Sequence, residues 1–97
     1  MRRIVFAPSF DREVEDIGVD VEERFGEAAR YEFIADLMAT CTLLASFPGM
    51  ANDRHGYDTS LVGFVFQVNW VFFEHDAVEV RFLHIVDSSR DKGSIPF

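Results

Sequence analysis

Cysteine, uninterrupted apolar sequence and basic charge are all scarce in this chain, and each shortage excludes a class of protein. Cys41 is the only cysteine among 97 residues, so no disulfide can form within the chain. Because Cys41 lies among apolar residues of a helical pattern, we interpret it as a small core hydrophobe and not as a nucleophile. A disulfide-stabilised secreted domain is therefore excluded.

Long apolar runs are also missing. The richest segment, Leu61 to Val86, is interrupted by Glu74-His75-Asp76, so it does not fit a transmembrane helix. At the start, two arginines are followed by only Ile4–Ala7 before Pro8, which is too short for the apolar region of a signal peptide. We therefore expect a cytoplasmic protein that has no membrane partner.

Basic residues are outnumbered, with nine Lys and Arg against 17 Asp and Glu, for a net charge of -8. Such a chain repels phosphate backbones, so we expect no direct binding to nucleic acid. The acids concentrate in residues 11–36, which hold ten carboxylates and three arginines. We interpret this segment as a solvated helix face; the alternative is a docking surface for a basic partner.

The periodic segments that are present predict an α+β fold in one domain, residues 1–97. Arg3–Ala7 is a short apolar run that Pro8 ends, typical of a buried strand. Apolar residues then recur at helical spacing, with Gly18 as a candidate bend and Gly26 between two helices. The expected apolar stripe of the first helix is Phe10, Val14, Ile17, Val21 and Phe25. The second helix has one stripe of Tyr31, Ile34, Met38, Cys41 and Ala45 and an adjacent one of Phe33, Leu37 and Leu44.

The second helix is expected over Glu27–Ser46, where Phe47-Pro48-Gly49 ends it, and a loop follows over residues 50–60. Strands are expected near Leu61–Phe66, Trp70–Phe73 and Val78–Val86, which are rich in β-branched and aromatic residues. In the last strand, strict alternation groups Val78, Val80, Phe82, His84 and Val86 on one face and Glu79, Arg81, Leu83, Ile85 and Asp87 on the other. His84 is therefore interpreted as a core histidine.

Three segments resemble the RelE/ParE toxin superfamily, and ParE-type toxins in particular. They are IVFAPSFDREVEDI at residues 4–17, LLASFPG at residues 43–49 and VRFLHIVDSSRD at residues 80–91. The resemblance implies a β-α-α-β-β-β order, with a helical hairpin packed on a small, mainly antiparallel sheet. It also implies the toxin of a type II toxin-antitoxin system used in plasmid stabilization. Such a toxin inhibits DNA gyrase by protein-protein contact, and a cognate antitoxin neutralises it in a heterotetramer, or the toxin forms a homodimer.

The sequence departs from the superfamily where RNA chemistry would be expected. Leu61-Val62 stands where the family commonly has Leu-Arg. In the family's Arg-x-x-His-x-x-Arg-Asp pattern only Arg90-Asp91 match, since His84 replaces the first Arg and Asp87 replaces the His. RNA cleavage needs an acid, a base and cations that stabilise the developing charge. A RelE-like ribosome-dependent ribonuclease is therefore the alternative, with Arg81, His84 and Arg90 as its catalytic residues. A non-toxic homologue that acts as a binding module is a third reading.

Four residues are the candidates for binding: Arg54, Arg81, Arg90 and Trp70. Arg54 lies in the predicted loop, where binding residues tend to gather. Arg90 matches the family, and Arg81 is either a binding residue or an outward ion-pair partner of Glu79 and Asp87. Trp70 is included because at least one aromatic of its strand must face away from the helices. We expect the antitoxin to be held mostly by apolar contacts with the sheet and the second helix.

No cofactor and no metal are expected. His55 lies near Asp53 and Asp58, but a second histidine at ligand spacing is missing.

Overall fold

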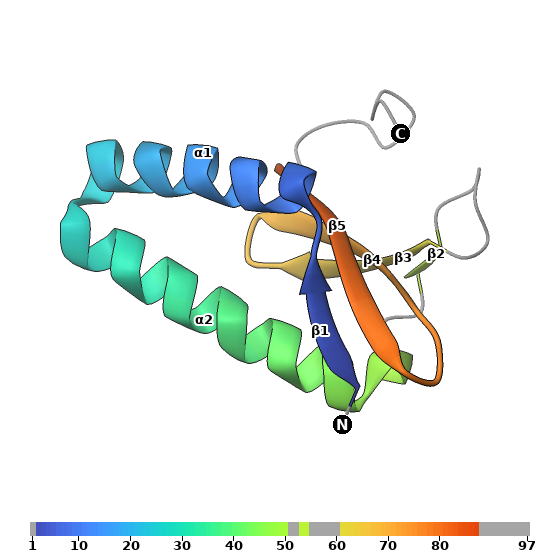
Figure 1. Ribbon diagram of the computed structural model, residues 1–97. Helices are drawn as coiled ribbons and strands as arrows, with labels where there is room; N and C mark the ends of the chain where they lie inside the picture. Colours follow the sequence, from blue (N-terminus) through green and yellow to red (C-terminus); the bar gives the residue numbers. More distant parts are fainter. Residues whose placement is uncertain (1, 51–52, 55–60, 88–97) are drawn as a thin grey trace.

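The predicted order of one strand, two helices and three strands is confirmed in a computed structural model, which describes residues 2–50, 53–54 and 61–87 (Figure 1). The elements are β1 (Arg3–Phe6), α1 (Pro8–Phe25), α2 (Glu27–Ser46), a 3-10 turn η1 (Pro48–Met50), β2 (Asp53–Arg54), β3 (Val62–Phe66), β4 (Asn69–His75) and β5 (Glu79–Asp87). The short strand β2 was not predicted from the sequence. It falls inside the segment expected to be a loop.

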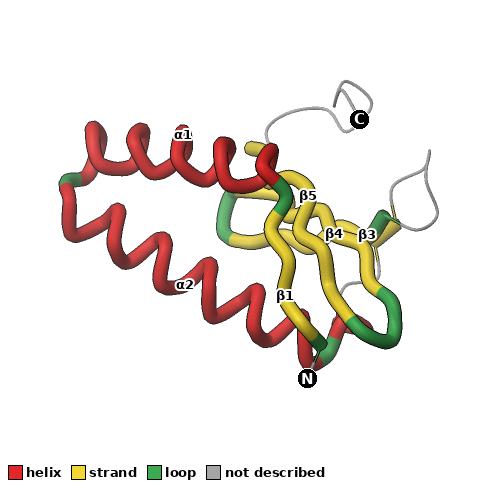
Figure 2. The backbone as a smooth tube through the Cα atoms, viewed as in Figure 1, coloured by secondary structure: helices red, strands yellow, loops and turns green. Residues whose placement is uncertain are grey.

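The strands form one sheet in the order β1-β5-β4-β3-β2, in which β1 is parallel to β5 and the other pairs are antiparallel. The helical hairpin covers one face of this sheet and extends beyond it (Figure 2). Because β1 is an edge strand, its residues are exposed or half-buried, and the prediction of a buried first strand is wrong.

A single glycine joins the two helices. Gly26 has φ 97, a left-handed value that glycine adopts without steric cost, and its N–H donates to the carbonyl of Glu22. Gly18 was a candidate bend, and α1 continues through it without a break. A Cβ at Gly18 would lie 3.1 Å from Nε of Arg30, so the glycine leaves space for that side chain.

The side chain of Arg30 on α2 occupies this space and binds carboxylates of α1. Its guanidinium donates to Glu15 at 2.9 Å and to Glu22 at 3.2 Å, and these two hydrogen bonds raise the pKa of Arg30. Two carboxylates of the acidic segment are therefore ion-paired between the helices and are not merely solvated.

The core between the helices and the sheet is built around a cluster of phenylalanines. Phe10 from α1 and Phe82 from β5 are both 0% exposed, and Phe6 stacks on each of them at ring-centroid distances of 5.5 and 5.6 Å. Cys41 is buried on α2, and desolvation raises the pKa of its thiol to about 12. Its interpretation as a core hydrophobe is confirmed.

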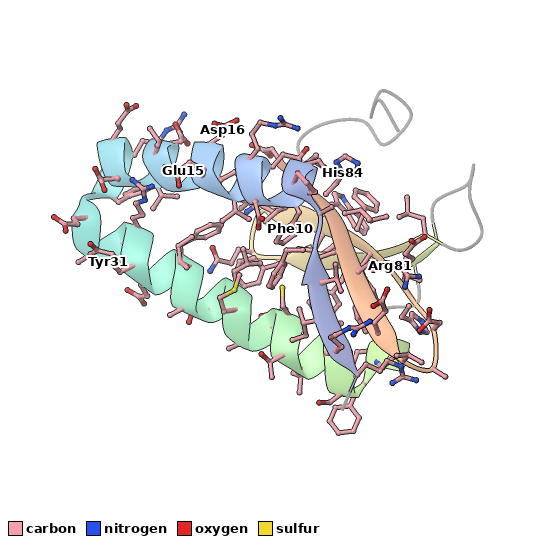
Figure 3. All side chains as sticks on the ribbon, viewed as in Figure 1. Phe10, Glu15, Asp16, Tyr31, Arg81 and His84 are labelled. Carbon is pink, nitrogen blue, oxygen red and sulfur yellow. The ribbon has the colours of Figure 1, made fainter. Side chains whose placement is uncertain are left out.

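The apolar stripes of the helices are only partly buried. Phe25 is 74% exposed and Tyr31 is 66% exposed, although helical spacing places both on the predicted stripes. Both lie at the joined ends of the hairpin, where it extends past the sheet, and Figure 3 shows Tyr31 there. In the described part of the chain, the structure contains no helix that is long and apolar enough to cross a membrane.

A β-bulge in β5 changes which residues share a face. Phe72 of β4 pairs with His84, whereas the next residue, Phe73, pairs with Phe82, so Leu83 is the extra residue. Beyond the bulge, the alternation of residues between the two faces of β5 is the reverse of the one predicted. The prediction of a core histidine is therefore wrong, because the pairing with Phe72 places His84 on the face opposite the helices.

Candidate functional site

The sheet face opposite the helices holds three of the predicted site residues, namely Arg81, His84 and Trp70. Each is fixed by its cross-strand partner: Arg81 lies opposite Glu74, His84 opposite Phe72, and Trp70 opposite Val86. The backbone of Arg54 pairs with Val62 in β2, while its side chain lies outside the described residues. Arg90 and His55 also lie outside them.

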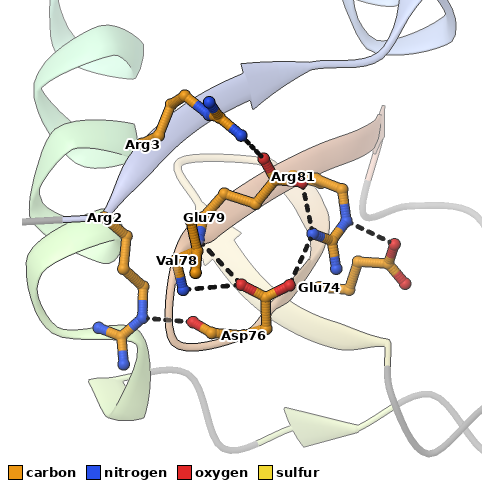
Figure 4. A network of polar contacts seen from close by, with 7 residues as sticks. All are labelled: Arg2, Arg3, Glu74, Asp76, Val78, Glu79 and Arg81. Carbon is orange, nitrogen blue, oxygen red and sulfur yellow. Dashed lines mark hydrogen bonds and ion pairs between the residues drawn. The ribbon is translucent and has the colours of Figure 1, made fainter.

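Arg81 is surrounded by carboxylates of its own β-hairpin (Figure 4). Its Nε donates to Glu74 at 2.9 Å, and its Nη1 donates to Glu79 at 2.7 Å and to Asp76 at 3.2 Å. These hydrogen bonds, led by the one to Glu74, raise the pKa of the guanidinium. Of the two partners expected from the sequence, Glu79 is found. Asp87 lies at the far end of β5, and Glu74 and Asp76 complete the set.

Two further arginines extend the network. Arg3 donates to the second carboxylate oxygen of Glu79 at 2.8 Å, and Arg2 donates to the backbone carbonyl of Asp76 at 2.7 Å. Asp76 itself accepts the backbone N–H groups of Val78 and Glu79 at 2.8 and 2.9 Å. These two bonds, with Arg81 as a further cause, lower the pKa of Asp76 to about 2. The contacts of this cluster hold the β4–β5 hairpin against β1 and stabilise the fold.

Asp76 should give this hairpin a stability that depends on pH. Its pKa in the folded chain is lower than in the unfolded chain, so its stabilising effect is complete above about pH 4 and is lost as the pH falls toward 2. Replacing Asp76 with Asn or Ala should therefore lower the melting temperature at pH 7, and the difference from wild type should shrink between pH 4 and pH 2. Thermal unfolding followed by circular dichroism at several pH values measures this. Asn can still accept the two N–H groups, so it should be the milder change. A difference that stays constant with pH would contradict the prediction.

His84 is held by α1. Its Nδ1 lies 3.2 Å from both carboxylate oxygens of Glu13, and one of these oxygens also accepts the N–H of Ile85 at 3.2 Å. Ser9, one turn earlier, donates to the carbonyl of Leu83 at 2.7 Å. The first turns of α1 therefore continue the hydrogen bonding of β5 beyond the end of β1. Ser9 and Glu13 share a helix face at a spacing of four, but their contact with β5 was not predicted from the sequence.

Trp70 is part of an apolar patch on the same sheet face. Its ring stacks on Phe72 at 5.9 Å, and Leu61 and Val86 are buried beside them. The two rings lie close above Gly63: a Cβ there would be 3.2 Å from atoms of both. Two aromatic residues, Trp70 and Phe72, thus face away from the helices, as the sequence predicted for at least one.

Gly63→Ala tests this packing. The added methyl group should force both rings to move, so we expect the free energy of unfolding to fall by about 1–3 kcal/mol. Gly49→Ala is the matched control, because a Cβ there meets nothing within 4 Å. Urea unfolding of the two variants measures the effect. Equal midpoints for the two variants would show that the rings tolerate the methyl group.

Within the described ranges, no group of three or more His, Cys, Asp or Glu side chains is placed to hold a metal ion. The chemistry available on this face is a histidine beside a carboxylate, an arginine engaged by carboxylates, and an apolar aromatic patch.

Comparison with known proteins gives a match at the level of structure only. No family model and no curated protein matches this sequence. A chain of the chromosomal ParDE TA system from P. aeruginosa superimposes with a TM-score of 0.76 and 11% identity, covering 90% of this chain and 96% of the other. A chain of the E. coli DinJ-YafQ toxin-antitoxin complex superimposes with a TM-score of 0.52 and 12% identity, covering 91% and 93%. The fold of this chain is therefore the RelE/ParE-like α+β fold.

Proposed function

We propose that this protein is the toxin of a type II toxin-antitoxin system, of the ParE-like type. It would act in the cytoplasm by protein-protein contact, with DNA gyrase as its target, and a cognate antitoxin would neutralise it. The observation that carries this proposal is the similarity of nearly the whole chain to a chain of a ParDE TA system at a TM-score of 0.76, against 0.52 for the DinJ-YafQ complex.

The setting of Arg81 supports the ParE-like reading over a ribonuclease. A ribonuclease needs cations that are available to the phosphate of the substrate. The Arg81 side chain donates to Glu74, Asp76 and Glu79, and a phosphate would have to compete with these three carboxylates. Action by protein-protein contact needs no such cation.

The experiment is expression of the chain in bacteria from an inducible promoter, with and without the neighbouring open reading frame. We expect growth arrest that the neighbouring frame relieves, and inhibition of gyrase supercoiling by the purified chain. Primer extension on RNA from arrested cells should show no codon-specific cuts.

Other results would favour the alternatives. Codon-specific cuts that disappear in Arg81→Ala or His84→Ala, with both variants shown to be folded, would favour the ribonuclease. A folded chain that causes no arrest but binds the product of the neighbouring frame would favour the non-toxic binding module.

A further inference from the structure

A groove of about 640 Å³ lies between the two helices and the β3–β4 turn, away from the sheet face that carries Arg81 and Trp70. It is lined by residues of α1 and α2, by Gln67, Val68 and Asn69 at the β3–β4 turn, and by Asp87 of β5. Its apolar part comes from Ile17, Val21, Phe25, Phe33 and Val68. Phe25 and Val68 are 74% and 67% exposed. The groove therefore exposes apolar surface that no other residue of the described ranges covers.

The charge around this apolar surface is almost entirely negative. The carboxylates that line the groove are Asp16, Asp20, Glu32, Asp36 and Asp87, and Arg24 is the one cation among the lining residues. Arg24 is bound to Asp20 at 3.1 Å, so it offsets a single carboxylate. An apolar cleft with an acidic rim complements a segment that carries an apolar residue between basic ones.

Asn69 supplies a second, independent observation. Among the described residues, Asn69 is the polar residue that is buried, at 5% exposure, and it lines the groove. The pairing of Asn69 with Phe66 and Asp87 places it on the face that the helices cover. Among the described residues its amide has no hydrogen-bond partner. A buried amide without a partner is unfavourable, and the backbone of a bound segment could supply both a donor and an acceptor.

We propose that this groove docks a basic, amphipathic segment of a partner protein. An apolar side chain of the segment contacts Ile17, Val21 and Phe33, and its Lys or Arg residues lie against Asp16, Glu32 and Asp36. The Asn69 amide hydrogen-bonds the backbone of the segment. A second copy of this chain is a poor occupant, because a net charge of -8 on each copy makes them repel.

This proposal concerns the chemistry of the bound segment and does not depend on the toxin activity. If the antitoxin is the partner, its contacting segment is basic, in addition to the apolar contacts expected from the sequence. The sequence favoured a solvated face for residues 11–36, and we assign the docking alternative to those acids that line the groove.

The first test selects peptides from a random twelve-residue library displayed on phage, with the full chain immobilised. We expect the enriched peptides to share an apolar or aromatic residue flanked by Lys or Arg. Enrichment of acidic or uncharged peptides, or no enrichment, would overturn the proposal. So would concentration-dependent dimerisation that the groove substitutions abolish, because the occupant would then be a second copy.

The second test measures the affinity of the best peptide by calorimetry for two variants with the same charge change. The groove variant combines Asp16→Asn, Glu32→Gln and Asp36→Asn; the control combines Asp11→Asn, Glu23→Gln and Glu27→Gln, which lie on the same helices but do not line the groove. We expect affinity to fall about tenfold or more in the groove variant and much less in the control. Equal losses would mean that the peptide responds only to net charge.

Asn69→Leu separates a binding role from a structural one. If the amide has no partner in the free chain, an apolar side chain of similar size should leave the melting temperature unchanged or raised, while the affinity for the peptide falls. A fall in melting temperature with unchanged affinity would show that Asn69 is structural and would remove it from the proposed site.

Discussion

Replacing Phe82 with alanine should lower the free energy of unfolding by about 3–5 kcal/mol, the range typical of a buried phenylalanine. The ring is 0% exposed and lies 5.6 Å from those of Phe6 and Phe73 and 5.8 Å from that of Phe10. Truncation therefore leaves a cavity where β1, α1, β4 and β5 meet. Since single domains are stable by about 5–15 kcal/mol, this variant should lose a large part of its stability.

Urea unfolding at constant temperature measures the effect, and the slope of the transition should be unchanged if only stability is altered. Phe25→Ala is the matched control: it removes the same atoms from a ring that is 74% exposed, so its midpoint should lie close to wild type. Similar midpoints for Phe82→Ala and Phe25→Ala would contradict the assignment of Phe82 to the centre of the core.

The helices could be predicted from the sequence because their signals are local. The structure gives α2 as Glu27–Ser46, as predicted. Helical spacing identifies an apolar stripe, but it does not show how far the covering sheet extends. Phe25 and Tyr31 are exposed for this reason, since the hairpin is longer than the sheet that it covers.

The order of the helices and strands along the chain could also be predicted, but the faces of β5 could not. Alternation holds from Val80 to Phe82 and then reverses at the bulge. The bulge is a property of the pairing with β4, and nothing within the segment 79–87 marks it. Because of the one extra residue, His84 lies on the sheet face opposite to the predicted one. There its ring contacts the carboxylate of Glu13 on α1, which is 71 positions earlier in the sequence.

For the charged residues too, contacts within one strand could be predicted, whereas contacts between elements could not. Arg81 and Glu79 are two positions apart on one strand face, so their contact could be foreseen from the strand period. The groove could not be foreseen, because Asp16, Asp36 and Asn69 come from three elements that meet only in the folded chain. The acidic composition of residues 11–36 was visible in the sequence, whereas the division of those acids between Arg30, His84 and the groove was not.

Replacing Arg81 with methionine should destabilise the folded chain strongly at pH 7, because the change leaves Glu74, Asp76 and Glu79 close together without the cation that they share. Arg81 contributes to the lowered pKa values of Asp76 and Glu79, so the pKa values of these two carboxylates should rise in the variant. The loss of stability should therefore shrink as the pH is lowered from 6 toward 3. Melting temperatures of wild type and variant over this range measure it, and a loss that is equal at pH 6 and pH 3 would contradict the charge explanation.

Rescue of this variant separates the two roles of Arg81. The combination Arg81→Met, Glu74→Gln and Glu79→Gln removes the repulsion, so its melting temperature at pH 7 should recover toward wild type. If Arg81 only fastens the β4–β5 hairpin, this rescued chain should arrest growth as wild type does, because a toxin that acts by protein-protein contact needs the fold and not the guanidinium. A rescued chain that is stable but inactive, together with loss of codon-specific RNA cuts, would instead make Arg81 a catalytic residue of a ribonuclease. The growth assay on the rescued variant thus tests the function after stability has been restored.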